Sequence, residues 1–459
     1  MNLPRGFLLL ALAACVPAQE APRDLAHSVL KELIEIDTTD SAGDNTAAAE
    51  AVARRLRSAG FDASDVEVIA PAPKKGNVVA RLRGSGRGRP VLFIAHLDVV
   101  EARREDWSMD PFRLNEKDGY FYGRGTQDIK GEAALLVTNF MRLKREGFRP
   151  ERDLILALTA DEEGGRGPNG IAWLLAHRRD AIDAEFCVNM DSGGGQVKDG
   201  RRILYSVQAA EKGYLSFVLR ARNAGGHSSL PVRENAIYDL AAALLRLSEV
   251  RFPLHLNEVT RAYFERTALL EGERDAADRR AVAQVPPDTA AADRLAASPF
   301  ENALLRTTCV PTMLSGGHAD NALPQTAEAT VNCRVLPGET QDEVGRRIRE
   351  AAGPGIEIAV KSPLRPSPAS PVSPALLDRV QGVVRSLWPG MVVVPVMETG
   401  ATDGKTLRAA GIPAYGMGQI FFDLDDVRAH GRDERIRVAY FDDGLEFGYR
   451  LMKEMARAL

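Results

Sequence analysis

The chain has 459 residues, which is enough for two or three domains with sizeable cores. Apolar residues make up 45% of it and charged residues 27%, the composition of an ordinary soluble globular protein, and the net charge is −4. Positive and negative charges are interspersed, so no basic face indicates a nucleic-acid partner. After the N-terminus, no apolar run approaches the roughly 18 residues of a membrane span.

Residues 1–20 have the layout of a signal peptide. One positive charge precedes the apolar run 7–14 (FLLLALAA), which is too short to span a membrane. Residues 12–15 (LAAC) also resemble the bacterial lipobox, in which Cys15 becomes the lipidated first residue and the only membrane attachment. The alternative is an ordinary secretory signal that is cut after Ala18. In both cases we expect an exported protein: periplasmic, an outer-membrane lipoprotein, or secreted.

The mature chain keeps three widely spaced cysteines, Cys187, Cys309 and Cys333. This number and spacing match neither a disulfide framework nor a zinc site of the CxxC type. One disulfide is compatible with the sequence, which does not indicate the pair. The favoured interpretation is that these residues are buried free thiols.

The first predicted elements are amphipathic helices over 24–36 and 45–59, followed by a strand over 77–83. The next strand, within 91–98 (VLFIAHLD), ends at His96 and Asp98. A histidine followed two residues later by a carboxylate suits a metal ligand and the group that fixes its tautomer. Taken alone, this HxD pattern is more typical of a buried structural histidine.

The glycine-rich stretch 122–131 (YGRGTQDIKG) lets the backbone approach a site closely, although a turn before the helix over 132–144 is the alternative.

Two further strand ends also carry carboxylates. The apolar run 154–158 ends in Asp161, Glu162 and Glu163, which repel each other unless a positive group lies nearby. The alternative there is a solvated turn at a helix N-terminus. The stretch 186–191 (FCVNMD) repeats the pattern of a strand that ends in a carboxylate.

These charged side chains are predicted to converge. The first half of the chain alternates strands and helices, which indicates an α/β fold whose strands present His96, Asp128, Glu162, Glu163 and Asp191 at one sheet edge. Oxygen-rich ligands with a minority of histidine suit zinc, manganese or cobalt. Several carboxylates together suit a site for two metal ions.

The motifs in this order resemble the M20 family of metallopeptidases: HLD (96–98), GRGTQDIKG (123–131), DEEGG (161–165) and NMDSG (189–193). The family includes carboxypeptidases, dipeptidases, aminoacylases and succinyl-diaminopimelate desuccinylases. The resemblance implies a three-layer αβα di-zinc catalytic domain over 21–210 and 362–459. It also implies an inserted α+β lid, or dimerisation, domain over 211–361.

The resemblance also assigns the metal ligands. His96 and Asp191 would hold one zinc ion, while Glu163 and His430, in RAHGRDE (428–434), would hold the other. Asp128 would bridge the two ions, and the family often has a cis peptide bond just after this aspartate. We therefore expect two Zn²⁺ per chain, with Co²⁺ or Mn²⁺ as substitutes.

Three residues would serve catalysis. Glu162 would be the general base, and Asp98 would orient His96. His227, in AGGHSSLP (224–231), matches the lid histidine that stabilises the oxyanion in the partner subunit's site, which implies a homodimer. The alternative is that His227 is an exposed residue of a helix-capping loop.

Three more residues would bind the substrate. Asn321 and Arg334 match the pair that grips the substrate carboxylate, and a guanidinium can do so bidentately. The alternative for Arg334 is a surface position on a strand. Thr402, in ETGATD (398–403), would contact the substrate from a loop that resembles the family's GGTD loop.

The resemblance predicts an exopeptidase, a carboxypeptidase or dipeptidase that uses a metal-bridged water to hydrolyse an amide bond beside a free carboxylate. An N-acyl-amino-acid deacylase is the first alternative. It is favoured by the helical insertion over 251–298, which resembles one in the carboxypeptidase S-like branch. A catalytically inactive binding lipoprotein is the second alternative. The side-chain preference is left open.

Overall fold

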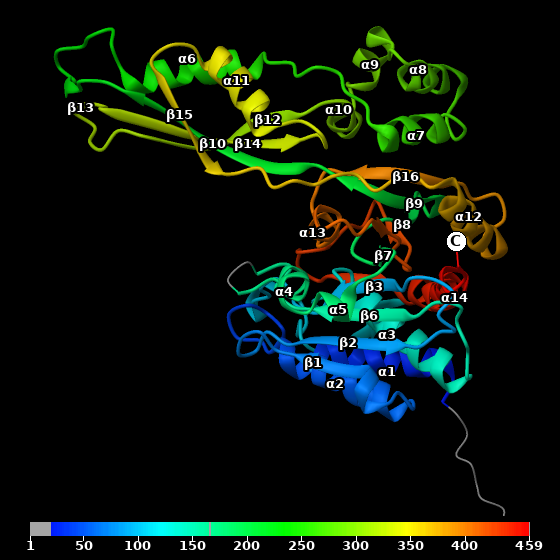
Figure 1. Cartoon of the computed structure of the whole chain (residues 1–459). Coiled ribbons are helices and arrows are strands. Elements are labelled where there is room, and N and C mark those ends of the chain that lie inside the picture. Colours follow the sequence, from blue (N-terminus) through cyan, green and yellow to red (C-terminus); the bar gives the residue numbers. More distant parts are fainter. Residues whose placement is uncertain (1–19, 165–166, 459) are drawn as a thin grey trace, which may run out of the picture.

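We describe a computed structural model of the chain, in which residues 20–164 and 167–458 are described. The predicted lipidation site Cys15 lies outside these ranges, as does Gly165, the last residue of the DEEGG stretch. A large α/β body forms one end of the molecule and a long, narrow lid lies across its other end (Figure 1). Within the described ranges, no helix is both long and apolar enough to cross a membrane.

The body is built on one ten-stranded sheet with the order β1-β2-β6-β3-β7-β17-β9-β8-β18 and β16 beside β9. Its strands are β1 (Val66–Ile69), β2 (Asn77–Leu82), β3 (Val91–His96), β6 (Leu154–Thr159), β7 (Phe186–Asn189), β8 (Gly194–Lys198), β9 (Arg201–Glu211), β16 (Val393–Glu398), β17 (Ala414–Gly416) and β18 (Phe422–Asp423).

The central strands β6, β3, β7 and β17 are parallel, and their register brings their last residues to one edge. His96 pairs with Thr159, and Asn189 pairs with both Ile94 and Gly416. The carboxyl ends of parallel strands are where open α/β sheets bind ligands. The predicted convergence of strand ends is therefore confirmed.

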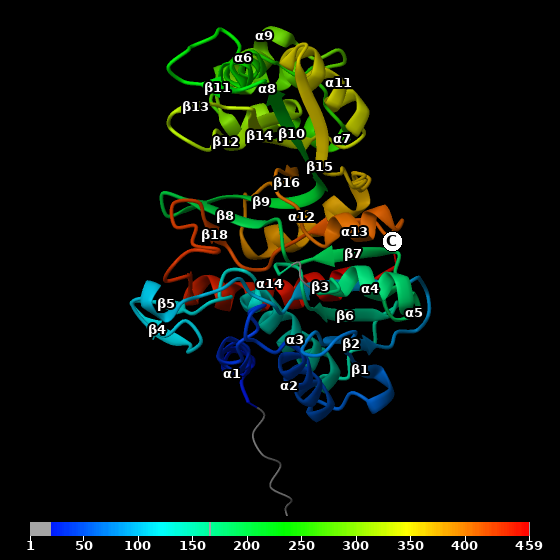
Figure 2. The same cartoon turned by 90° about the vertical axis from the view of Figure 1, so that its left-hand side faces the viewer.

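Helices cover both faces of the sheet, so its central strands are apolar on both sides (Figure 2). In β3, Phe93 packs toward one helical layer and Ile94 toward the other. The first layer contains α1 (Pro22–Glu35), α2 (Asn45–Ser58), α3 (Lys130–Arg145), α12 (Pro374–Leu387) and α14 (Val438–Met455). The second contains α4 (Gly170–His177), α5 (Arg179–Ile182) and α13 (Gly404–Ala409). The predicted three-layer α/β architecture is confirmed.

A small sheet ties two distant segments together beside the main one. It consists of β4 (Asn115–Lys117), β5 (Tyr120–Tyr122) and β19 (Arg435–Arg437), in the order β19-β5-β4. Because β5 precedes Asp128 and β19 follows His430, this pairing brings two predicted metal ligands from far apart in the sequence to one place. Two short 3₁₀ helices, Ala63–Asp65 and Arg104–Asp106, lie in loops of the body.

The lid is a four-stranded antiparallel sheet with helices on one face. Its strands, β10 (Gly213–Arg222), β12 (Thr308–Gly316), β14 (Thr326–Val335) and β15 (Ile356–Ser362), lie in the order β12-β14-β10-β15. Burial alternates strictly along β14, because α6 (Ala236–Ser248) and α11 (Gln341–Ala352) cover one side only. A two-stranded ribbon of β11 (Gly226–His227) and β13 (Ala322–Leu323) forms the end of the lid that points away from the body (Figure 1).

The stretch 251–298 is helical as predicted, with α7 (Glu258–Thr267), α8 (Glu273–Ala283) and α9 (Thr289–Leu295), and α10 (Pro299–Leu305) follows just after it. These helices pack on the body rather than on the lid sheet: Phe264 and Val282 belong to the main core of the body. Arg266 of α7 also donates a hydrogen bond to the carbonyl of Val393 in β16, at 2.9 Å.

The interpretation of all three cysteines as free thiols is wrong for two of them. Cys309 in β12 and Cys333 in β14 are directly paired residues of neighbouring strands and form a disulfide. Cys187 in β7 is a buried free thiol, as expected. The pairing depends on the register of the lid sheet, which the spacing of cysteines in the sequence does not reveal.

Candidate metal centre and substrate pocket

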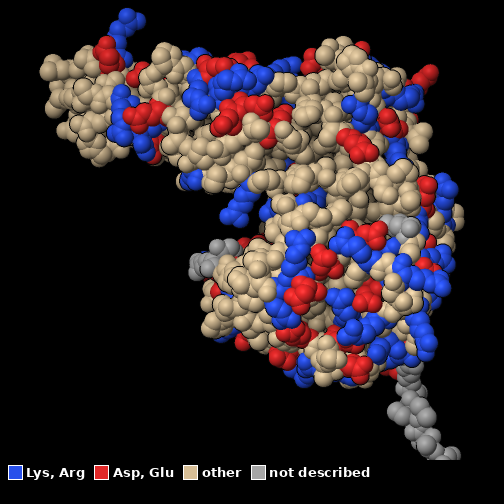
Figure 3. Space-filling model, in the orientation of Figure 1, with Lys and Arg blue, Asp and Glu red and all other residues tan. Residues whose placement is uncertain are grey.

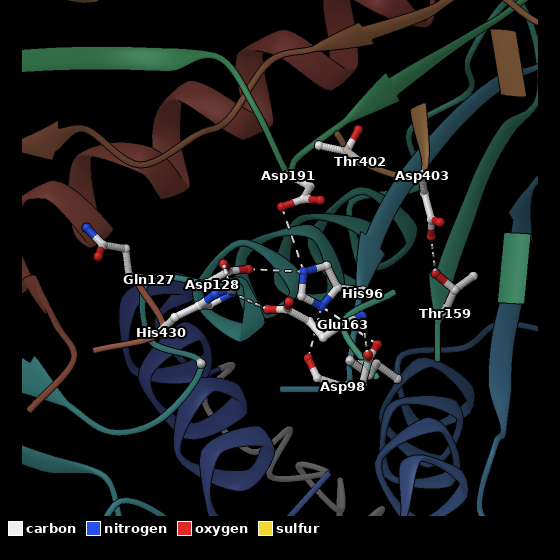
Figure 4. Close-up of polar contacts among 12 residues, drawn as sticks. His96, Asp98, Gln127, Asp128, Thr159, Glu163, Asp191, Thr402, Asp403 and His430 are labelled. Carbon is white, nitrogen blue, oxygen red and sulfur yellow. Dashed lines mark hydrogen bonds and ion pairs between the residues drawn. The ribbon is translucent and has the colours of Figure 1, made fainter. Parts of the chain in front are cut away.

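All five predicted metal ligands come together at the carboxyl edge of the main sheet (Figure 4). His96 is the last residue of β3, Glu163 follows β6, and Asp191 follows β7. Asp128 comes just before α3, and its peptide bond to Ile129 is cis. His430 comes from the loop before β19 and has a left-handed backbone conformation, with φ of 61°.

Asp128 lies between the two histidines. Its Oδ1 is 3.1 Å from Nε2 of His96, and its Oδ2 is 3.1 Å from Nε2 of His430. His430 Nε2 is also 2.7 Å from Oε1 of Glu163, and His96 Nε2 is 3.7 Å from Oδ1 of Asp191. Each histidine thus shares Asp128 and has one further carboxylate of its own, an arrangement that fits a bridging ligand between two metal ions.

The histidines and carboxylates shift each other's pKa values. Burial raises the pKa of Asp128, but hydrogen bonds from His430 and His96 outweigh it and hold that pKa below its ordinary value. Hydrogen bonds to Asp128 and Glu163 raise the pKa of His430 to about 10. Burial lowers the pKa of His96, but Asp128 and Asp191 outweigh it, so the net shift is upward. The centre therefore stabilises positive charge.

The remaining carboxylates are left with an excess of negative charge. Burial, together with the charges of Asp191 and Asp403, raises the pKa of Glu162 to about 9. Burial raises the pKa of Asp191 to about 7. Ligand atoms of His96, Glu162 and Asp191 lie within 4.8 Å of one another, as do those of His96, Asp128 and Glu163. Four carboxylates and two imidazoles so arranged fit divalent metal ions.

Asp98 contacts the His96 ring at closest range through its backbone carbonyl, and its carboxylate lies further away. His96 Nδ1 is 2.9 Å from the carbonyl oxygen of Asp98, whereas the nearer carboxylate oxygen is 3.8 Å away. A carbonyl only accepts, so Nδ1 carries the proton and Nε2 faces the metal centre as a free ligand. The Asp98 carboxylate instead accepts a hydrogen bond from the backbone N–H of Glu163, at 2.8 Å. One carboxylate oxygen of Asp98 thus holds the backbone of Glu163, while the other faces His96 Nδ1 across 3.8 Å.

Glu434 is a supporting residue that the sequence pattern did not single out. It is fully buried, and its Oε1 accepts hydrogen bonds from the backbone N–H groups of Gly125, Gln127 and Asp128, at 3.1, 2.7 and 3.0 Å. Its other oxygen pairs with Arg124. Glu434 therefore holds the Asp128 loop in place. Its position four residues after His430, within the quoted RAHGRDE stretch, is the signal that could have found it.

Asp403 and Lys75 hold the loop of Glu162 and Glu163 from the other side. Asp403 accepts a hydrogen bond from Asn169 Nδ2 at 2.7 Å. Lys75 pairs with Asp161 at 2.6 Å, where the backbone has φ of 66°. The two contacts fix both ends of the turn after β6. Asp403 belongs to the quoted ETGATD stretch, whereas Lys75 has no signal in the sequence.

A pocket of about 360 Å³ opens beside the metal centre. Its lining includes Glu162, an apolar wall and four of the predicted metal ligands: Asp128, Glu163, Asp191 and His430. The wall consists of Ile129, Met190, Ile420, Phe421, Phe422 and Ile436. The pocket thus joins a group of carboxylates to a surface suited to an apolar part of a ligand.

Thr402 lines this pocket but its hydroxyl is committed elsewhere. Its Oγ1 donates to Oε1 of buried Glu211 at 2.6 Å and accepts from Nδ2 of Asn189 at 2.9 Å. The side chain is 7% exposed. Thr402 therefore fixes the 398–403 loop to the main sheet, because the buried Glu211 carboxylate needs donors, and its contact with a substrate stays a prediction.

The three lid residues do not meet in one chain. Arg334 of β14 reaches the loop at the pocket, where Nη1 donates to the carbonyl of Thr399 at 3.4 Å. His227 and Asn321 lie together at the ribbon of β11 and β13 and are exposed. Strand β14 begins at Thr326, beside the ribbon. Arg334 lies eight residues further along this strand, which is about 26 Å away. The pocket is lined by residues of the body.

The fold and the ligand set together define a class of two-metal hydrolases on an α/β sheet. The model of peptidase family M20/M25/M40 matches residues 92–454, and the chain belongs to this family. The resemblance inferred from the motifs is confirmed, and so is the assignment as a hydrolase that acts on amide bonds.

Curated relatives span several activities. The N-fatty-acyl-amino acid synthase/hydrolase PM20D1 of Homo sapiens is 30% identical over 378 residues, which cover 80% of this chain and 74% of that protein. Probable carboxypeptidase S-like 2 of Dictyostelium discoideum is 28% identical, with 81% and 72% covered. Among solved structures, the M20 family metallo-carboxypeptidase Sso-CP2 from Sulfolobus solfataricus has the same fold, with a TM-score of 0.65 at 16% identity and 94% and 99% of the chains covered.

The shared position of Asp128 gives the first prediction. An Asp128→Ala variant should lose both metal ions because each histidine depends on the same carboxylate, whereas His430→Ala should lose about one of the two. Metal content after dialysis, measured by mass spectrometry, checks this. His177→Ala is the control and should keep the metal content of the wild type. His177 is exposed, and its Nδ1 lies beside the backbone carbonyl of Trp173. Two ions retained by Asp128→Ala would contradict the bridging role.

Proposed function

We propose that the chain is a zinc-dependent hydrolase of N-acyl amino acids, which cleaves the amide bond beside a free carboxylate. The observation that carries this proposal is the apolar wall of the pocket, within the same cavity as Glu162 and the metal ligands. An acyl group would occupy the wall, and the amide would then lie at the metal centre. The human relative whose printed name describes N-fatty-acyl-amino acids supports this substrate class.

The residues of the chain supply the acid–base chemistry. Two divalent ions held by His96, Asp128, Glu163, Asp191 and His430 would lower the pKa of a water molecule and polarise the scissile carbonyl. Glu162 takes a proton from the attacking water and passes it to the leaving amine nitrogen. Its high pKa without bound ions fits this position, because added positive charge brings the pKa of a carboxyl down into a working range.

Arg334 is proposed to bind the free carboxylate of the substrate. Its guanidinium is half-buried, lies over the ring of Tyr214 and reaches the 398–403 loop at the pocket. A guanidinium can form two parallel hydrogen bonds with a carboxylate, which a lysine cannot. This contact would select substrates that end in a carboxylate next to the scissile bond.

Glu162 provides the direct test of the mechanism. Glu162→Gln should keep both metal ions but lower kcat by roughly 10²–10⁴-fold, because the variant cannot accept a proton. Metal content and turnover of an N-acyl amino acid are measured on the same preparation. A variant that keeps its metal and more than half of its activity would refute the role of Glu162 as general base.

A second candidate, a carboxypeptidase or dipeptidase, is favoured by Glu398, whose carboxyl group also lines the pocket. An ionised Glu398 could pair with the N-terminal ammonium of a dipeptide. Burial and the charge of Glu211, however, raise the pKa of Glu398 and disfavour the ionised form. The complete set of ligands and Glu162 gives no support to an inactive binding protein.

The two candidates predict opposite preferences. We expect kcat/KM for N-acyl amino acids to exceed that for dipeptides with the same C-terminal residue by about tenfold or more, because an ammonium is costly to desolvate against an apolar wall. Initial rates on matched pairs of substrates check this. Faster cleavage of the dipeptides would make the exopeptidase the better assignment.

We also propose a homodimer in which His227 and Asn321 act on a second copy's site. Within one chain these residues lie at the far end of the lid, which projects beyond the body (Figure 3). The lid exposes apolar side chains on its edge strand β12 and on α6: Val310, Met313, Leu314, Tyr238 and Leu245. An exposed edge strand with apolar side chains is a typical pairing surface.

Complementation tests this arrangement. Alone, His227→Ala should lower kcat by roughly 10²–10³-fold, as expected for loss of an oxyanion donor. In a refolded equimolar mixture with Glu162→Gln, half of the dimers are mixed and each of these has one intact site, so about a quarter of wild-type activity should return. No recovery in mixed dimers that have been verified by mass spectrometry would contradict the exchange of His227 between subunits.

A further inference from the structure

Glu132 is a buried carboxylate that the mechanism does not use. It lies in the first turn of α3, is 6% exposed and lines the pocket. Its hydrogen bonds come from amide groups: the backbone N–H of Gln419 at 2.8 Å, the backbone N–H of Ile420 at 2.8 Å, and Nε2 of Gln419 at 3.0 Å. Burial raises the pKa of Glu132 to about 7, although these hydrogen bonds act against the shift.

The segment that Glu132 binds, residues 418–422, connects β17 to β18 and is fitted closely into the body. Tyr205 donates its hydroxyl to the carbonyl of Gly418 at 3.0 Å, and Gly418 N–H donates to the carbonyl of Ser192, also at 3.0 Å. The second contact joins this segment to the residue that follows Asp191. The backbone at Gly418 is therefore fixed relative to the metal centre.

Gln419 fits into a groove that two glycines leave open on α14. A Cβ atom at Gly448 would lie 1.7 Å from Oε1 of Gln419, and one at Gly444 would lie 2.9 Å from its backbone oxygen. These glycines allow the segment to lie directly on the helix, with the side-chain amide of Gln419 directed to Glu132. The packing on α14 thus places the donors of the segment against the carboxylate.

The next residues of the same segment form the apolar wall of the pocket. Ile420 and Phe421 line the pocket beside Phe422. Behind the wall, the ring of Phe421 packs edge-on against Trp388, with ring centroids 4.6 Å apart. Because the N–H of Ile420 is bound by Glu132, the carboxylate holds this part of the wall at its backbone.

From these contacts we infer that Glu132 is a positioning residue that holds the 418–422 wall, and through it sets how the pocket accepts the apolar acyl group of a substrate. The inference rests on the proposed hydrolysis of N-acyl amino acids. The carboxylate of Glu132 binds Gln419 and Ile420, and neither of these residues is one of the predicted metal ligands. Loss of the carboxylate should therefore loosen the wall and leave the metal ions in place.

The test compares Glu132→Leu, which removes the acceptors at similar volume, with Glu132→Gln, which keeps one acceptor oxygen. Substrates are N-acyl derivatives of one amino acid, with acyl groups from acetyl to dodecanoyl. For Glu132→Leu we expect KM for the dodecanoyl substrate to rise about tenfold, with kcat and KM for the acetyl substrate within about twofold of wild type. Glu132→Gln should restore most of the affinity. Glu146→Gln, beside the other end of α3, is the matched control and should behave as wild type.

Metal content and thermal unfolding are recorded for each variant. If Glu132→Leu does not fold, Glu132→Gln provides the test. In this variant, the KM for the dodecanoyl substrate divided by the KM for the acetyl substrate should be about threefold higher than in the wild type. Equal changes of KM for all acyl lengths, or a fall in kcat alone, would overturn the inference. A residue that only stabilises the fold would affect substrates with short and long acyl groups alike.

The outcome can be separated from failure of the proposed function. If the wild-type protein cleaves no N-acyl amino acid, that function is wrong, and the binding of dodecanoate by calorimetry tests the wall instead. Binding by wild type that Glu132→Leu weakens about tenfold would support the inference. Equal affinity of the two proteins, or no binding by wild type, would overturn it.

Discussion

The structure depends above all on the crowding of like charges around Asp128. Strands β3, β6 and β7, together with the segments around Asp128 and His430, bring four carboxylates and two imidazoles to one sheet edge. Burial, and after it the repulsion between carboxylates that share the site, raises the pKa values of Glu162 and Asp191. Divalent cations would remove this repulsion. The arrangement is therefore costly to the apoprotein and favourable to a protein that holds two metal ions.

The surrounding residues keep these charges in position. Glu434 binds the backbone of the Asp128 loop, and the Asp98 carboxylate binds the backbone of Glu163. Both use carboxylate oxygens to accept hydrogen bonds from backbone N–H groups, so the loops are fixed at their backbone. Glu132 does the same for the wall of the pocket. Functional loops are thus held on a rigid sheet by buried acceptors, which is how a fold keeps a site within narrow geometric limits.

Much of this could be predicted from the sequence, for identifiable physical reasons. His96 and Asp191 end apolar runs that are recognisable as buried strands, and parallel strands must present their ends at one edge. Other features depend on contacts between distant segments. The disulfide between Cys309 and Cys333 requires the register of the lid sheet, and the hydroxyl of Thr402 is taken by Glu211, which is 191 residues away. The charged, Ala-rich composition of the stretch 251–298 favours helices, but nothing local reveals that Phe264 packs on the body.

We propose that Asp128 would bridge two metal ions, one held with His96 and the other with His430. Anomalous diffraction from crystals of the metal-loaded protein, measured at the zinc absorption edge, tests it most directly. We expect two peaks on either side of the Asp128 carboxylate, one beside His96 and Asp191 and the other beside Glu163 and His430. A single peak, or two peaks of which neither contacts Asp128, would contradict the proposal.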